Sequence, residues 1–361
     1  MSLFALYRTR DKPSRIEIDD ALAGNLCRCT GYRPIVEAAR TMYELPSPAA
    51  EIVHADLLDA LDAEEALEIE GGDRRFFAPV SNDGLAQLLA DYPNATILAG
   101  GTDVGLWVTK QHRELETVIY TGRVAELCDI AETDTHIEIG AAVTLSDAMQ
   151  VITRHYPELE ELFRRFASPP IRNAGTLGGN IANGSPIGDS MPALMVMGST
   201  LLIHSVLGER ETTLEDFYID YQVQDLRSSE FLATVRIPKP SRDAFLRSYK
   251  ISKRFDQDIS AVCTAFRLEL REGKVAGFAM ACGGLAATIK RASNCEAALL
   301  GADWSEAAIE RAAEALAEDF TPISDMRASA EYRLLVTQNL LRRFYLDSIG
   351  EFEQTVYNYG R

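Results

Sequence analysis

Two cysteines near the N-terminus are spaced so that they could bind a metal. Cys27 and Cys29 are separated by one residue, in a turn bounded by Gly24 and Gly31. Thiolates are metal ligands, and the intervening Arg28 favours anionic sulfur. A pair of ordinary thiols in a turn between two helices fits this spacing equally well. The pair alone therefore indicates at most half of a metal site.

A first glycine-rich loop could bind a diphosphate. Residues 97–105 read ILAGGTDVG and follow a short apolar run. Adjacent glycines allow successive backbone N–H groups to converge on an anion. The spacing differs from the Rossmann pattern G-x-G-x-x-G. A purely structural tight turn explains this loop alone equally well.

A second glycine-rich loop strengthens the case for a dinucleotide. Residues 173–189 read NAGTLGGNIANGSPIGD and carry one charged side chain, Asp189. Their amides, hydroxyls and N–H groups match a ligand with phosphates and many hydroxyls. A disordered linker is the competing interpretation, and Ile171, Leu177 and Ile181 argue against it because they favour packing.

The cysteine turn resembles a known family. Residues 24–35, GNLCRCTGYRPI, closely resemble the second cysteine pair of the [2Fe–2S] helical domain of molybdenum hydroxylases, such as xanthine dehydrogenases, aldehyde oxidases and carbon monoxide dehydrogenases. The resemblance implies that Cys27 and Cys29 are half of a [2Fe–2S] site, which needs four protein ligands. In that family more residues precede this pair than the 26 found here. We therefore expect that the sequence starts inside the domain and assembles no normal cluster alone.

The two glycine loops resemble the FAD-binding domain of the same family. In that domain Asp189 would accept hydrogen bonds from sugar or ribityl hydroxyls, and Phe166 would lie near the flavin or adenine. Lys250 would lie close to the cofactor, although an ordinary exposed strand lysine is an equal alternative. Gln257 stands in a loop near the flavin's nicotinamide-facing side, where relatives often carry an acid. The resemblance implies these cofactor-binding residues: Leu98, Ala99, Gly100, Gly101, Thr102, Asp103, Val104, Gly105, Phe166, Thr176, Gly179, Asn180, Asp189, Leu232 and Lys250.

The elements that must position these residues predict an α+β fold. We expect a partial [2Fe–2S]-binding helical domain at 1–45, a linker at 46–75, a two-part α/β FAD-binding domain at 76–240, and a small antiparallel sheet with helices at 241–361. Apolar runs and periodicity predict strands at 95–99, 117–120, 135–139, 200–205, 245–251, 262–271 and 274–282. Helices are predicted at 16–22, 35–43, 145–155, 213–218, 305–319 and 328–348, and residues 168–189 are predicted to be mostly loop.

Composition excludes several classes of function. The 361 residues carry a net charge of −18, with 54 acidic against 36 basic residues, which disfavours nucleic-acid binding. No apolar run approaches the roughly 20 residues of a membrane span, and the N-terminus is not typical of a signal peptide. A cytoplasmic location is the expectation. The remaining cysteines are expected to be buried apolar residues, and all histidines structural or on the surface: Cys128, Cys263, Cys282 and Cys295; His54, His112, His136, His155 and His204.

The resemblance to molybdenum hydroxylases implies an electron-transfer subunit with no catalytic side chain of its own. The resemblance implies that it passes electrons from molybdenum and iron–sulfur centres through FAD to NAD⁺. A molybdenum-cofactor large subunit is the expected partner, in a heteromer or dimer. Two alternatives stay open: the flavoprotein subunit of another molybdenum hydroxylase, acting on an aldehyde or N-heterocycle, or a non-catalytic fragment that binds no flavin.

Overall fold

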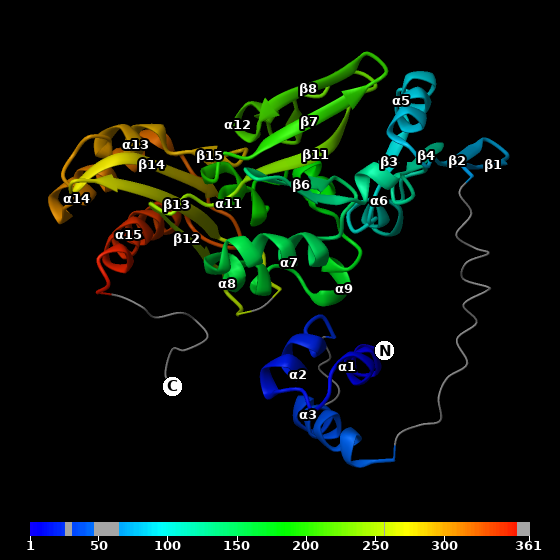
Figure 1. Ribbon diagram of the computed structural model, residues 1–361, viewed down its shortest axis with the longest axis horizontal. Helices are drawn as coiled ribbons and strands as arrows, with labels where there is room; N and C mark the ends of the chain where they lie inside the picture. The colour runs from blue at the N-terminus through cyan, green and yellow to red at the C-terminus, as the bar shows by residue number, and fades with distance from the viewer. Residues whose placement is uncertain (26–30, 47–64, 256, 352–361) are drawn as a thin grey trace.

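The computed structural model describes residues 1–25, 31–46, 65–255 and 257–351 (Figure 1). In these residues it shows a small helical unit, two larger sheets with surrounding helices, a two-stranded sheet of β9 (Tyr218–Asp220) and β10 (Val223–Gln224), and a C-terminal sheet covered by helices. The predicted α+β class is confirmed. No helix in these ranges is long and apolar enough to cross a bilayer.

Three helices form the N-terminal unit: α1 (Ser2–Thr9), α2 (Arg15–Leu22) and α3 (Tyr32–Thr41), followed by the short turn η1 (Met42–Glu44). Ser14 starts α2 with a capping box: its hydroxyl accepts from the Glu17 N–H at 3.2 Å, and the Glu17 carboxylate accepts from the Ser14 N–H at 2.8 Å. The unit has its own small core of Leu6, Ile18, Val36 and Ala39. Both predicted helices are present.

The first sheet has the order β1-β2-β4-β3 and begins before the predicted boundary at residue 76. Its strands are β1 (Leu67–Gly71), β2 (Arg74–Ala78), β3 (Thr96–Leu98) and β4 (Thr117–Tyr120), with α5 (Asn82–Asp91) between β2 and β3. The prediction of a linker is therefore wrong for residues 67–75, which form a hairpin. Leu67 and Ile69 alternate with glutamates on an exposed strand, so the acidic composition hid a two-residue period.

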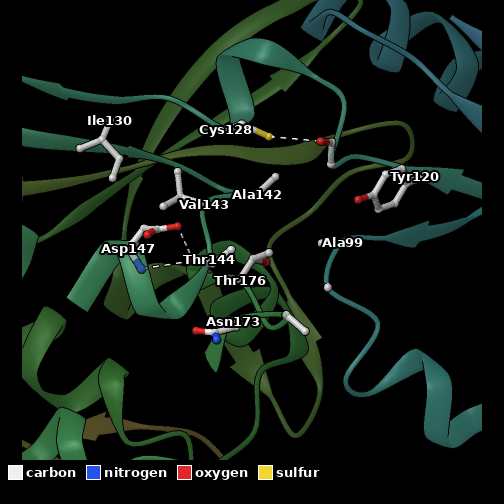
Figure 2. Close-up of a pocket in the computed structure, with 13 residues that line it drawn as sticks. Ala99, Tyr120, Cys128, Ile130, Ala142, Val143, Thr144, Asp147, Asn173 and Thr176 are labelled. Atoms are coloured by element: carbon white, nitrogen blue, oxygen red, sulfur yellow. Dashed lines mark hydrogen bonds between the residues drawn. The ribbon is translucent and has the colours of Figure 1, made fainter. Parts of the chain in front are cut away.

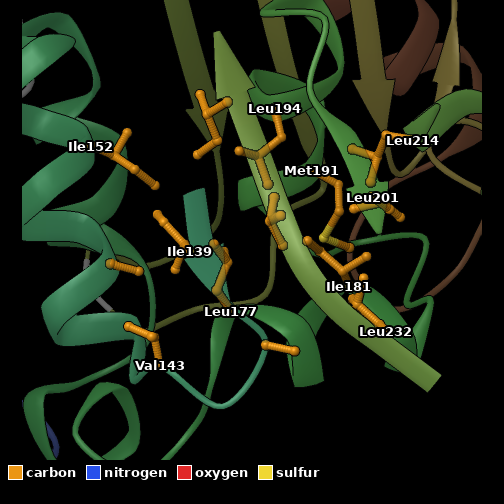
Figure 3. Close-up of a cluster of buried hydrophobic side chains, with 14 of the residues drawn as sticks. Ile139, Val143, Ile152, Leu177, Ile181, Met191, Leu194, Leu201, Leu214 and Leu232 are labelled. Carbon is orange, nitrogen blue, oxygen red and sulfur yellow. The ribbon is translucent and has the colours of Figure 1, made fainter. Parts of the chain in front are cut away.

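The second sheet has the order β5-β6-β11-β7-β8 and lies against the largest core of the molecule. Its strands are β5 (Ile130–Glu132), β6 (His136–Gly140), β7 (Thr200–Ser205), β8 (Gly208–Thr213) and β11 (Phe231–Pro238). Figure 3 shows Ile139, Leu201 and Leu232 of three strands facing Leu177, Ile181, Met191 and Leu194 of the helices. The central strand β11 was not predicted, because its first three residues are all buried and break the alternation.

Helices around the second sheet include much of the segment predicted to be loop. They are α7 (Leu145–His155), α8 (Glu160–Arg165), α9 (Pro169–Arg172), α10 (Leu177–Asn183), α11 (Ser190–Val196) and α12 (Leu214–Phe217). The loop prediction at 168–189 is wrong for α9 and α10. Position 178, inside α10, requires glycine because a Cβ there would lie 2.4 Å from the Ala141 side chain. This glycine therefore allows close packing and does not indicate a flexible loop.

The C-terminal part is an antiparallel sheet with helices, as predicted. Strands β12 (Ala244–Ile251), β13 (Val262–Arg271), β14 (Lys274–Gly283) and β15 (Lys290–Arg291) pair in sequence order. Helices α13 (Ser293–Leu299), α14 (Glu306–Asp319) and α15 (Ala330–Ser348) enclose a second core. In it Phe266 and Phe344 stack with ring centroids 4.8 Å apart. The buried helix α11 contacts β13 and β14, so it joins the C-terminal sheet to the main core.

Candidate functional site

A cavity of about 580 Å³ lies where the two glycine loops meet, between the first and second sheets (Figure 2). The residues that follow β3 and the end of β4 line one side of the cavity. The remaining lining residues come from the segments before and after β6, from the start of α7 and from the second glycine loop. The lining residues are Ala99, Gly100, Tyr120, Gly122, Cys128, Ile130, Ala142, Val143, Thr144, Asp147, Asn173, Ala174 and Thr176. The cavity is therefore built from both of the loops that the sequence singled out.

Gly100 permits the contact between these loops. A Cβ built on Gly100 would lie 1.7 Å from the carbonyl oxygen of Ala174 and 2.8 Å from the Cα of Gly175. No side chain fits at that distance, so only glycine allows the two backbones to approach. The next residue, Gly101, has a φ of +70°, in the left-handed region that favours glycine.

The first loop offers backbone donors to a ligand. Among the described residues, the N–H groups from Gly100 to Asp103 have no hydrogen-bond acceptor. Successive free N–H groups in a turn form a concave site for an anion. Buried or half-buried N–H groups without acceptors are costly, so an anionic ligand would satisfy them. The residues present therefore fit a diphosphate.

The second loop contributes the start of α10. The Thr176 hydroxyl caps this helix by accepting from the Gly179 N–H at 3.0 Å. The amide oxygen of Asn180 accepts from Ser190 Oγ at 2.7 Å. Thr176 lines the cavity, whereas the donor of Gly179 is used within the helix. Direct ligand contact at Gly179 and Asn180 stays a prediction.

Asp189 and Lys250 form a buried ion pair between the end of the second loop and β12. Their side chains are 4% and 2% exposed. Lys250 Nζ donates to the Asp189 carboxylate, to Ser260 Oγ at 2.9 Å and to the carbonyl oxygen of Asp258 at 2.8 Å. Ser260 Oγ in turn donates to the other carboxylate oxygen of Asp189 at 2.5 Å. The alternative of an exposed strand lysine is therefore wrong.

Three family models match this chain. Residues 69–240 match the FAD binding domain in molybdopterin dehydrogenase, residues 247–348 the CO dehydrogenase flavoprotein C-terminal domain, and residues 1–40 a [2Fe–2S] binding domain. The chain belongs to the molybdenum hydroxylase family. It contains that family's FAD-binding domain, and the cavity between the two glycine loops lies within the residues that match it.

Relatives of known sequence and structure agree with the family. The chain is 28% identical to the xanthine dehydrogenase/oxidase of Gallus gallus and 27% identical to aldehyde oxidase 1 of Bos taurus, over 96% of its length in both comparisons. It spans about a third of these relatives, 31% and 30% of their lengths. Carbon monoxide dehydrogenase from Hydrogenophaga pseudoflava superposes with a TM-score of 0.71 at 25% identity, over 76% of this chain and 96% of that one. Quinoline 2-oxidoreductase from Pseudomonas putida 86 superposes with a TM-score of 0.70 at 25% identity, over 79% and 100%.

Three other predicted cofactor residues, Phe166, Leu232 and Gly105, are not among the residues that line the cavity. Phe166 is half-buried against the main core, and Leu232 is buried within it, on β11. Gly105 stands in the first turn of α6 (Val104–Thr109), where a Cβ would meet nothing within 4 Å. Contact of FAD with these three residues, and with the remaining predicted ones, stays a prediction.

The cysteines divide into two groups in the described residues. Cys263, Cys282 and Cys295 are buried, as predicted. Cys128 is exposed and lines the cavity, so the prediction of a buried residue is wrong there. It follows the short turn η2 (Ala125–Leu127), whose Leu127 fills the core instead. The predicted half-site of Cys27 and Cys29 lies outside the described residues, within which no other group of metal-ligating side chains is assembled.

Cys128 provides a chemical test of where FAD binds. Desolvation raises the pKa of its thiol, so we expect slow alkylation at neutral pH that accelerates as the pH rises. FAD at ten times its Kd should slow alkylation about tenfold, because it occupies the same cavity. Peptide mass mapping of flavin-free and reconstituted protein measures the rate at Cys128, with buried Cys263 reporting global opening. Equal rates with and without FAD would place the cofactor elsewhere.

Proposed function

We propose that this chain is the FAD-binding electron-transfer subunit of a xanthine-dehydrogenase-like molybdenum hydroxylase. The observation that supports it most directly is the close approach of Gly100 to Ala174 at the cavity. Next to it, the N–H groups from Gly100 to Asp103 have no acceptor among the described residues. Bound FAD would supply the redox chemistry, receiving electrons from molybdenum and iron–sulfur centres and reducing NAD⁺. The protein's task is to hold the cofactor and to shape its surroundings.

Each part of the chain has a role in this proposal. Gly100 and Gly101 would hold the diphosphate through their backbone N–H groups. Thr176 would add a hydroxyl on the opposite wall, and the Lys250–Asp189 pair would place a fixed charge pair beside the cofactor. The acid and the thiol that line the cavity, Asp147 and Cys128, would face bound FAD rather than an organic substrate. We therefore infer that substrate oxidation belongs to a partner that carries the molybdenum cofactor.

The order of modules supports a likeness to xanthine dehydrogenase. One chain joins matches to the [2Fe–2S] binding domain, the FAD binding domain and the flavoprotein C-terminal domain. Xanthine dehydrogenases of Gallus gallus and Arabidopsis thaliana align over 96% of this chain. NAD⁺ as acceptor and assembly into a heteromer or dimer follow from this likeness as part of the proposal.

A flavoprotein subunit of a different molybdenum hydroxylase is the second candidate. The superposition on quinoline 2-oxidoreductase covers 100% of the quinoline 2-oxidoreductase chain. The superposition on carbon monoxide dehydrogenase covers 96% of the carbon monoxide dehydrogenase chain. Sequence identities of 25% to 28% leave both acceptor and organic substrate open to this candidate. A substrate screen with the co-purified molybdenum subunit separates the two.

The visible absorption spectrum of the purified protein tests the proposal. We expect a two-band yellow flavin spectrum that yields FAD on heating, and anaerobic NADH should bleach it. Bleaching by NADH supports the NAD⁺-linked function, whereas a flavin that NADH leaves oxidised favours the second candidate. A colourless protein that stays so after incubation with FAD would overturn both.

A further inference from the structure

Two consecutive arginines end helix α8 and contact different parts of the chain. Arg164 lies against the N-terminal unit, where its Nε and Nη2 atoms are both 2.8 Å from Asp20 Oδ2 of α2. Arg165 lies against the end of β12 and against the loop that follows it, of which the structure describes residues 252–255 and 257–261, defined here as the β12–β13 loop. It donates to the carbonyl oxygens of Lys250 at 3.0 Å and Phe255 at 3.2 Å. One short helix therefore contacts both segments.

A second contact joins the same two segments. Gly24, just after α2, has a φ of +92°, and a Cβ built there would lie 2.7 Å from Ser168 Oγ. The same position is 3.6 Å from Oε1 of Gln257 in the β12–β13 loop. The backbone at Gly24 is thus packed closely against Ser168, beyond α8, and lies near Gln257 of this loop. Figure 1 shows α2 beneath α8 and α9.

The Arg165 side chain is more deeply buried than that of Arg164, so its conformation is more restricted. Its side chain is 5% exposed, and it also lies over the ring of Phe255, 5.5 Å from the centroid. Arg164 is 23% exposed and Asp20 43%, so their ion pair is partly solvated and contributes modestly. Because the two arginines are neighbours, a shift of the end of α8 moves the donors that hold the loop.

We propose that docking of the N-terminal unit and the conformation of the β12–β13 loop are coupled through Arg164 and Arg165. The docked unit fixes the end of α8, and α8 fixes the loop through the buried guanidinium. Coupling of this kind is reciprocal, so a ligand that orders the loop also strengthens docking. The proposed coupling is argued from these contacts. Its functional role would be to link the N-terminal unit, whose sequence carries Cys27 and Cys29, to the side of FAD that faces the electron acceptor, and this role rests on the proposed function.

Charge reversal across the ion pair tests the coupling. Hydrogen exchange of residues 252–261 is measured by mass spectrometry in the full chain, for Asp20→Arg, Arg164→Asp and the double variant. Each single variant should accelerate exchange in this loop about fivefold, the factor that corresponds to one exposed ion pair, and the double variant should restore it. Asp19→Arg is the matched control, because Asp19 on the same helix pairs only with Arg15 among the described residues.

The outcomes separate coupling from simple docking. Exchange that rises only in residues 1–25, with 252–261 unchanged, would overturn the proposal. Gly24→Val is a second variant that leaves Asp20 and α2 unchanged. Its side chain would overlap with Ser168 and block the second contact, so it should also accelerate hydrogen exchange in the β12–β13 loop. Circular dichroism confirms that each variant is folded. The flavin spectrum is recorded on the same samples, so a failure of the proposed function is seen independently of the exchange rates.

Discussion

Replacing Gly100 by alanine is expected to lower the affinity for FAD about 100-fold. The added Cβ would lie 1.7 Å from the carbonyl oxygen of Ala174, so the two loops must separate. Their separation would move the free N–H groups of Gly100 to Asp103 away from the opposite wall. Titration of flavin-free protein with FAD, followed by quenching of flavin fluorescence, measures the change in Kd.

Gly71→Ala is the matched control for Gly100→Ala. Gly71 ends β1, and a Cβ there meets no atom within 4 Å, so wild-type affinity is expected. Thermal unfolding of both variants separates loss of binding from loss of folding, because overpacking at a loop contact costs about 1–3 kcal/mol. A Gly100→Ala variant that is folded and binds FAD with the wild-type Kd would contradict the assignment of this cavity.

The glycine loops were found from the sequence because their composition is unusual for either core or solvent. Gly100-Gly101 and the uncharged segment around Thr176 suggested backbone donors for a diphosphate, and the structure brings these loops together around one cavity. The α10 helix was missed because glycines disfavour helices, while Gly178 is required by contact with Ala141. Local propensity gave way there to tertiary packing.

Other parts of the site gave no local signal. Tyr120 and Cys128 line the cavity, but each looks in the sequence like an ordinary residue at the end of an apolar segment. Their position depends on how the first sheet meets the second, a long-range property that no short window contains. Burial of Lys250 likewise depends on Asp189, 61 residues earlier in the chain. Resemblance placed Lys250 near the cofactor, whereas its partner became visible only in the fold.

The buried pair of Lys250 and Asp189 is expected to have the largest effect on stability. Lys250→Met should lower the free energy of unfolding by about 3–5 kcal/mol, because it leaves the Asp189 carboxylate buried without its cation. Ser260 Oγ would be the remaining side-chain donor to that carboxylate among the described residues. Urea denaturation followed by circular dichroism measures the loss. The pair also joins the FAD-binding part to the C-terminal sheet, so FAD binding should weaken in parallel.

The double variant Lys250→Met/Asp189→Asn distinguishes an unpaired charge from a lost methylene contact. Removing both charges should recover more than half of the stability lost in Lys250→Met, because the neutral amide can still accept from Ser260 Oγ. Lys274→Met is the control: Lys274 Nζ lies 3.8 Å from Asp303, both side chains are exposed, and a change within about 1 kcal/mol is expected. Should Lys250→Met cost no more than Lys274→Met, the pair would hold the two parts together by shape alone. The charge that we place beside the cofactor would then have no energetic role in the fold.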